Sequence, residues 1–295
     1  MIIILPLRPF YDTIMLIIRK RKDMEDLVRQ YKLKNLSIGF VPTMGYLHEG
    51  HASLIRQSFN DQQITICSIF VNPTQFNNPE DFKLYPKDEK GDIKLLQDNG
   101  CDALFIPGDE FVNDILDVSI DMKGLDKILE GEFRPGHFKG MVNIVSLLFQ
   151  IVQPDKAYFG QKDFQQLCIV RMLAAQKFPK VEIVAAPIVR ETEGLAMSSR
   201  NARLSKEEKQ NAGKISQALF SIQKRSKQIH TAKVLKEQAI KDFFSSEDLK
   251  LEYLEIVDAQ TLVPVSELFS GLSAVVCVAA FSGKVRLIDN IVINS

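Results

Sequence analysis

Tryptophan is absent from this 295-residue sequence, and cysteine and histidine each occur only four times. The cysteines, Cys67, Cys101, Cys168 and Cys277, are widely spaced, and three of them lie in apolar or strand-like runs such as ITICSIFV and AVVCVAAF. This pattern argues against a disulfide framework and against a zinc knuckle. We expect four small buried side chains in a protein of a reducing compartment.

An excess of charge of either sign is also missing, because Lys plus Arg and Asp plus Glu both number 37. The basic run RKRK at residues 19–22 is followed at once by DMED. Both features argue against a nucleic-acid partner and an acidic membrane surface. A composition of 45% hydrophobic and 25% charged residues is typical of a soluble globular protein, and the length favours two domains.

Long uninterrupted apolar segments are lacking as well. The N-terminal stretch MIIILPLRPFYDTIMLII is interrupted by Arg8, Pro9 and Asp12, and it has neither a basic leader nor a small-residue cleavage site. It therefore resembles neither a membrane span nor a secretion signal. We expect a cytoplasmic protein in which residues 1–14 form an N-terminal extension outside the fold.

Short apolar runs rich in Ile, Val and Phe are present at residues 37–41, 63–71, 101–107, 156–160 and 181–189. Segments with helical spacing separate them, including HASLIRQSFN, KGDIKLLQDNG and GMVNIVSLLFQIVQ. Buried strands that alternate with helices predict an α/β fold, with a Rossmann-like parallel sheet wound on both faces, over residues 1–189. Ligands of such sheets bind beyond the carboxyl ends of the strands.

The pattern changes after Val189. Ser205 and Glu208 have the spacing of a capping box before a helix with one apolar face, and a second helix follows from Thr231. Three strand-like runs come next, at residues 251–258, 274–281 and 286–293. Residues 190–295 are therefore predicted to form a smaller α+β C-terminal domain.

The stretch VPTMGYLHEGHASL, residues 41–54, places His48 and His51 between a predicted strand and a helix that would begin just after Gly50. Free amides at a helix start attract anions, and Gly45 and Gly50 allow the backbone to approach one closely. We interpret the stretch as a phosphate site in which both imidazoles donate hydrogen bonds. A metal site and a pair of structural histidines are the alternatives, although HEGH is one residue short of the zinc-protease spacing.

Two further polar clusters suit a nucleotide. GQKDFQQL, residues 160–167, follows a predicted strand. Gly160 permits a tight turn there, Lys162 can reach a phosphate, and Asp163 can bind a ribose or cap the helix. RETEGLAMSSRNARLS, residues 190–205, brings hydroxyls, a guanidinium and an amide to the predicted domain junction, where they could clamp a triphosphate or form a polar linker.

Polar residues also gather in residues 70–92 and 131–140. The amide side chains that could hydrogen-bond a small hydroxylated substrate are Asn72, Gln75 and Gln166. The residues that could meet an anion are Arg134 and His137. The carboxylates that could hold magnesium together with phosphate oxygens are Asp88, Glu89 and Asp92.

The motifs PTMGYLHEGH, FVNPTQF, RPGHF, GQKDFQQL and MSSRN occur in this sequence. Together they resemble the pantothenate synthetase (pantoate–β-alanine ligase) family of the adenylate-forming nucleotidyltransferases, over residues 15–295. The resemblance implies an ATP-dependent condensation of pantoate with β-alanine through a pantoyl adenylate, with release of AMP and pyrophosphate. It also implies Mg²⁺ and a homodimer. Another nucleotidyltransferase, or a nucleotide-binding protein without turnover, is the alternative.

The resemblance assigns site residues motif by motif. The implied catalytic residues are His51, which would donate to the leaving group, and His48, Lys162 and Arg200. The residues that would line the ATP site are Met44, Gly45, Tyr46, Leu47, His48, Glu49, Gly50, His51, Gly160, Gln161, Lys162, Asp163, Val189, Met197, Ser198, Ser199 and Arg200. Those that would surround pantoate and β-alanine are Pro42, Met44, Asn72, Gln75, Tyr85, Arg134, His137 and Gln166.

This sequence departs from the family pattern at several places, two of which bear on the site. Tyr46 stands where a small residue is usual. The acidic pair that often precedes a helix near the magnesium site is here Gly91-Asp92, which leaves Asp92 as the metal-facing carboxylate.

Overall fold

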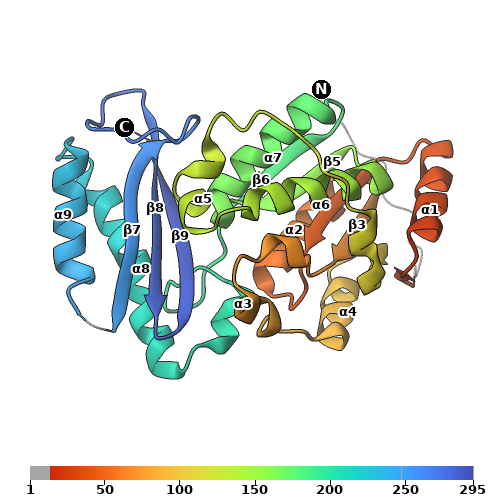
Figure 1. Ribbon diagram of the computed structural model, residues 1–295, viewed down its shortest axis with the longest axis horizontal. Coiled ribbons are helices and arrows are strands. Elements are labelled where there is room, and N and C mark those ends of the chain that lie inside the picture. Colours follow the sequence, from red (N-terminus) through yellow and green to blue (C-terminus); the bar gives the residue numbers. More distant parts are fainter. Residues whose placement is uncertain (1–13, 247, 295) are drawn as a thin grey trace.

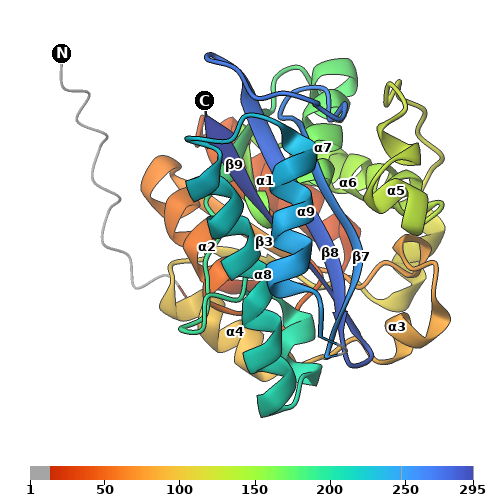
Figure 2. The ribbon, with the colours of Figure 1, turned by 90° about the vertical axis from the view of Figure 1, so that its left-hand side faces the viewer.

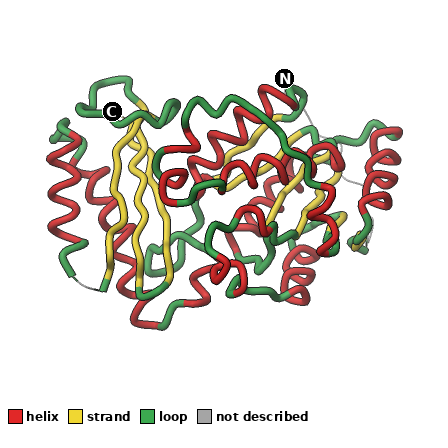
Figure 3. The backbone as a smooth tube through the Cα atoms, viewed as in Figure 1, coloured by secondary structure: helices red, strands yellow, loops and turns green. Residues whose placement is uncertain are grey.

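The computed structural model describes residues 14–246 and 248–294, so residues 1–13 of the predicted extension lie outside the described residues. The described chain contains a six-stranded sheet and a three-stranded sheet (Figures 1 and 3). All four cysteines are free and buried, as predicted. None of the helices in the described part of the chain combines the length and the apolar composition that crossing a membrane requires.

The larger sheet is parallel throughout, in the order β1-β4-β3-β2-β5-β6. Its strands are β1 (Leu16–Ile18), β2 (Ile38–Thr43), β3 (Ile64–Ile69), β4 (Ala103–Phe105), β5 (Lys156–Gly160) and β6 (Glu182–Ala186). The five predicted apolar runs are confirmed as strands. Sequence reasoning missed β1, because three residues at a sheet edge, two of them exposed, are too few to show a pattern.

Helices cover both faces of this sheet, as the alternating pattern predicted. One face packs against α1 (Arg21–Leu33), α6 (His137–Val152) and α7 (Phe164–Lys177). The opposite face packs against α2 (Glu49–Asp61) and α4 (Glu89–Asp98). Two short helices, α3 (Pro79–Lys83) and α5 (Glu130–Phe133), lie in the connections. The fold class is therefore confirmed as a doubly wound α/β architecture.

The smaller sheet is antiparallel and consists of β7 (Leu249–Asp258), β8 (Ser273–Ser282) and β9 (Val285–Asn294). Helices α8 (Lys206–Arg225) and α9 (Ala232–Phe243) lie against it, in front of the strands in Figure 2. The predicted Ser205–Glu208 capping box begins α8. In β8, Val276 packs towards α8 and α9 while Val275 and Cys277 join the core of the larger sheet, so the central strand is buried on both faces.

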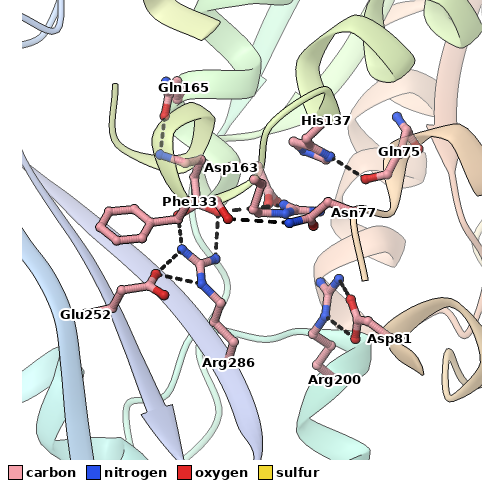
Figure 4. A network of polar contacts seen from close by, with 12 residues as sticks. Gln75, Asn77, Asp81, Phe133, His137, Asp163, Gln165, Arg200, Glu252 and Arg286 are labelled. Atoms are coloured by element: carbon pink, nitrogen blue, oxygen red, sulfur yellow. Dashed lines mark hydrogen bonds and ion pairs between the residues drawn. The ribbon is translucent and has the colours of Figure 1, made fainter. Parts of the chain in front are cut away.

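A buried ion-pair network joins the smaller sheet to α5. Arg286 of β9 donates two hydrogen bonds of 2.8 Å to the carboxylate of Glu130, and Glu252 of β7 accepts from the same guanidinium at 2.6 Å (Figure 4). The Tyr253 hydroxyl donates to Glu130 at 2.8 Å. Burial raises the pKa of the Glu130 carboxyl, but Arg286, Arg134 and Tyr253 together outweigh burial and hold this pKa at about 2.

We expect Arg286→Met to lower the free energy of unfolding by about 3 kcal/mol, because Glu130 would stay buried without its main partner. The control is Arg225→Met, which removes a 2.6 Å pair with the more exposed Asp242 and should cost less than about 1 kcal/mol. Urea unfolding at neutral pH would measure both. The folded pKa of Glu130 lies below its ordinary value of 4.5, so its contribution is present above pH 4.5 and lost as the pH falls towards 2. An equal loss of unfolding free energy in the two variants would contradict the role of Arg286 as the main partner of the buried Glu130.

Candidate functional site

The candidate site lies where two neighbouring parallel strands end. β2 pairs with β3 on one side and with β5 on the other, and the chain order reverses between β2 and β5. The histidine-bearing segment follows β2, and the turn that carries Lys162 follows β5. This is the switch point at which doubly wound sheets bind their ligands.

The first turn of α2 holds both histidines in defined orientations. The helix begins at Glu49, so the prediction of a start just after Gly50 is wrong, because His48 itself is the N-cap. Nδ1 of His48 accepts from the Gly50 amide at 3.2 Å, and Nδ1 of His51 accepts from the His48 amide at 3.3 Å. The two ring centroids are 4.1 Å apart. A Cβ atom at Gly50 would lie 2.9 Å from the His48 ring, which explains glycine at this position.

Both imidazoles are neutral at pH 7. Burial, reinforced by the Lys162 cation, lowers the pKa of His48 to about 4. Burial, then His48 and then Lys162, lower the pKa of His51 well below its ordinary value. A neutral imidazole accepts at one nitrogen and donates from the other. Since both Nδ1 atoms accept backbone hydrogen bonds, both Nε2 atoms are hydrogen-bond donors.

Two cations lie near these donors. Lys162 follows β5, and Asn290 of β9 fixes this turn by donating to the carbonyls of Gln161 and Lys162 at 2.9 and 2.8 Å. Arg200 lies in the 3₁₀ turn Ser199–Arg203 and pairs with Asp81 at 2.7 Å (Figure 4). Two guanidiniums therefore share one carboxylate, because Arg203 contacts Asp81 at 2.8 Å.

A cavity of about 210 Å³ brings most of the predicted site residues together. Those that line it are Pro42, Met44, His48, Gly50, His51, Gln75, Tyr85, His137, Gly160, Lys162, Asp163, Gln166, Val189, Met197, Ser198, Ser199 and Arg200. Asp163 precedes α7, but its side chain makes no capping hydrogen bond there. The cavity is thus lined by three histidines, by the Lys162 and Arg200 cations and by the Asp163 carboxylate.

Other predicted residues lie outside the lining of this cavity. The two turns after β2 and β5 contain four of them, Gly45, Tyr46, Leu47 and Gln161. Arg134 lines a smaller adjoining cavity together with Glu130. Two more are engaged within the fold. Asn72 is fully buried and donates to the Gly140 carbonyl at 3.1 Å. Glu49 pairs with Arg56 at the surface.

The three carboxylates suggested for magnesium do not fit a metal centre. Asp88 caps α4 by accepting from the Gly91 amide at 3.0 Å, and Glu89 pairs with Arg19 at 2.6 Å. Asp92 accepts from the amides of Tyr46 and Leu47. Within the described residues, no group of three or more His, Cys, Asp or Glu side chains is arranged to hold a metal ion.

Sequence reasoning missed part of the cavity. Its apolar wall comes from α6, where Met141, Ile144, Val145 and Leu148 face the polar groups. Their spacing is that of a helix packed in the core, so the sequence gave no sign that the same residues also line a cavity. The contacts of Asp81 and Asn290 with the site also depend on tertiary structure, because each partner is more than 100 residues away.

The fold and the site together define a nucleotide-binding α/β enzyme. Its hydrogen-bond donors lie at the switch point of a parallel sheet, where they can bind an anion. The model of the family described as pantoate-beta-alanine ligase matches residues 16–292, and this chain belongs to that family. The pantothenate synthetase of Cytophaga hutchinsonii is 49% identical over 89% of this chain and 93% of its own length. The Bacteroides thetaiotaomicron pantothenate synthetase is 46% identical over 94% and 98%.

Solved structures agree with this assignment. The pantothenate synthetase of Thermus thermophilus superimposes with a TM-score of 0.84 at 36% identity, and the match covers 94% of this chain and 99% of that one. The pantoate-beta-alanine ligase of Francisella tularensis gives a TM-score of 0.76 at 34% identity, covering 94% and 97%. The Francisella protein was solved in complex with beta-gamma ATP and β-alanine.

The neutral state of the histidines can be tested directly. Burial lowers the pKa of His137 to about 4, as it does for His48. We therefore expect the Cε1–H NMR resonances of His48, His51 and His137 to stay constant between about pH 7.5 and about pH 5.5. Single His→Gln variants would assign the signals. A midpoint near the ordinary value of 6.5 for His48 or His51 would contradict the buried, hydrogen-bonded arrangement.

Proposed function

We propose that this cavity catalyses the ATP-dependent condensation of pantoate with β-alanine to pantothenate, through a pantoyl adenylate, with release of AMP and pyrophosphate. The observation that carries the proposal is the convergence of two neutral imidazole donors and the Lys162 ammonium beyond β2 and β5. Family membership supports it, and so do the ligands bound to the Francisella relative.

The chemistry requires positioning and charge stabilisation. A carboxylate is a poor electrophile towards an amine, because it is anionic and its oxygen is a poor leaving group. It must therefore first be joined to AMP. In the first step, the pantoate carboxylate attacks the α-phosphorus of ATP and pyrophosphate leaves. His48, His51 and Lys162 would donate to the oxygens on which charge develops. In the second step, the β-alanine amine attacks the acyl carbon and AMP leaves.

Neutral imidazoles suit the first step. Pyrophosphate is a stable leaving group that needs hydrogen bonds more than a full proton. Donors held in place by the first turn of α2 need no reorganisation when charge moves onto the phosphate oxygens. Lys162 supplies a positive charge beside them, and Arg200 would supply a second one from the 3₁₀ turn.

Pantoate would bind between the amides and the apolar wall. Gln75 and Gln166 line the cavity with side chains that can bind hydroxyl and carboxylate groups. The α6 wall suits the two methyl groups of pantoate. His137 fixes the backbone of this region, because its Nδ1–H donates to the Gln75 carbonyl at 2.8 Å. Arg134, beside Glu130 at 3.6 Å, would contribute positive charge from the adjoining cavity.

We further propose that residues 190–295 form a second domain and that residues 197–200 act as a lid over the phosphates. The Ser199 hydroxyl supports this, because it donates to the Tyr46 carbonyl at 3.0 Å and so joins these residues to the turn before His48. Magnesium would enter as the counter-ion of the ATP phosphates, since the three candidate carboxylates are engaged elsewhere. A homodimer is proposed from family likeness, and a cytoplasmic location from the buried free cysteines.

The decisive assay is ATP–pyrophosphate exchange with magnesium and pantoate, followed by addition of β-alanine. We expect exchange that depends on pantoate, and then formation of AMP and pantothenate in equal amounts. Exchange without an amide product would indicate another nucleotidyltransferase activity. Folded protein that binds ATP but shows no exchange would contradict the proposal.

We expect His51→Ala and Lys162→Ala each to lower the exchange rate by about 10²-fold, the scale of losing one placed transition-state donor. His230→Ala is the matched histidine control, because His230 is exposed and outside the cavity. Lys156→Ala is the matched lysine control, because Lys156 lies at the amino end of β5, away from the site. Both controls should keep wild-type rates, and an equal loss in a control would show that folding, not donation, had been measured.

A further inference from the structure

We propose that Asp92 is a positioning residue that shapes the turn leading into His48, and that it does not ligate a metal ion. Asp92 is 4% exposed as a whole residue, and its Oδ2 and Oδ1 accept from the amides of Tyr46 and Leu47 at 2.9 and 2.6 Å. The proposed catalytic role of His48 is the one part of the proposed function on which this inference rests.

The turn needs an acceptor at this place. Gly45 has φ +82° and Tyr46 has φ +50°, so two consecutive residues adopt the left-handed conformation, which is unfavourable for a side chain such as tyrosine. A tight turn can direct successive backbone N–H groups towards one point, where an anion binds. Asp92 occupies that point, and a Cβ atom at Gly45 would lie 3.2 Å from Oδ2.

The turn is held from the opposite side as well. The Ser199 hydroxyl lies 3.0 Å from the Tyr46 carbonyl and 3.4 Å from the Gly45 carbonyl. Asp92 thus binds the N–H groups of the turn, while the proposed lid binds its carbonyls. Because His48 follows two residues after Tyr46, the carboxylate sets the path of the chain into the N-cap of α2.

The same contacts leave Asp92 poorly suited to a metal ion. Each carboxylate oxygen already accepts a short hydrogen bond from a backbone amide. Asp88 and Glu89, which would have to complete the site, are occupied by the N-cap of α4 and by Arg19. Magnesium requires an octahedral set of oxygens, and these side chains do not converge to offer one.

The test compares Asp92→Asn with Asp88→Asn and Glu89→Gln, all from the same helical turn. An Asn amide can accept only one of the two backbone hydrogen bonds, so we expect the exchange kcat to fall by about 10²-fold. The magnesium concentration for half-maximal rate should stay unchanged, and the two control variants should keep wild-type kcat. Recovery of Asp92→Asn at raised magnesium, or wild-type kcat in this variant, would overturn the proposal.

Two further measurements do not depend on turnover. The Cε1–H resonances of His48 and His51 should shift in Asp92→Asn and not in Asp88→Asn, and unchanged resonances would count against the positioning role. Mn²⁺ added to the nucleotide-free wild-type protein should leave the amide resonances of residues 44–51 unbroadened, whereas selective broadening there would overturn the proposal even if Asp92→Asn failed to fold. If the wild-type protein shows no ATP–pyrophosphate exchange, the proposed function is contradicted. The two measurements above still test the role of Asp92 in that case.

A rescue experiment separates the two roles of a carboxylate. Glycine adopts the left-handed conformation without steric cost, so Tyr46→Gly in the Asp92→Asn background should recover part of the lost kcat. Loss of a metal ligand would not be repaired by a change of backbone preference. A double variant no better than Asp92→Asn would contradict the positioning role.

Discussion

The parallel pairing of β2 with β5 is the constraint on which the site depends. It brings together two turns from distant parts of the chain, because both strands end at the same edge of the sheet. The pairing requires close packing behind it, since a Cβ atom at Gly39 would lie 2.1 Å from the Ser58 hydroxyl. Moving α2 to relieve such a contact would also move His48 and His51. The positions of the two histidines therefore depend on how α2 packs in the core.

Burial determines what the two histidines can do. In water an imidazole titrates near neutral pH, but here burial lowers the pKa of both rings, and backbone amides occupy both Nδ1 atoms. The result is two uncharged Nε2–H donors with fixed direction, while Lys162 and Arg200 supply the positive charge. The histidines thus supply hydrogen bonds of fixed direction, and the two cations supply the charge. This division suits a reaction in which negative charge moves between phosphate oxygens.

Much of this arrangement could be predicted from the sequence, for reasons that differ from element to element. Continuous apolar runs identify strands buried on both faces, and His48 and Lys162 follow two of them. The start of α2 was misplaced, because a histidine N-cap is not a usual signal. The sequence suggested Asp92 as a metal ligand, and it carried no sign that this carboxylate accepts hydrogen bonds from two backbone amides. Asn290 and Asp81 gave no local signal, since their partners come from distant parts of the chain.

The contacts of β9 determine which part of the C-terminal region can move. Arg286 is tied to Glu130 and Asn290 to the Lys162 turn, while Asp289 pairs with Arg190 at the start of the 190–205 loop. Rotating the whole three-stranded sheet would break all of these contacts and expose Val275 and Cys277 of β8, which belong to the same hydrophobic core as α6 and α7. Moving residues 197–200 breaks fewer contacts, namely those of Arg200 with Asp81, of Ser199 with the Gly45–Tyr46 turn and with Tyr85, and of the Met197 amide with the Val189 carbonyl. A nucleotide phosphate can replace Asp81 as the partner of Arg200, so closure over ATP is expected in this loop and not in the sheet.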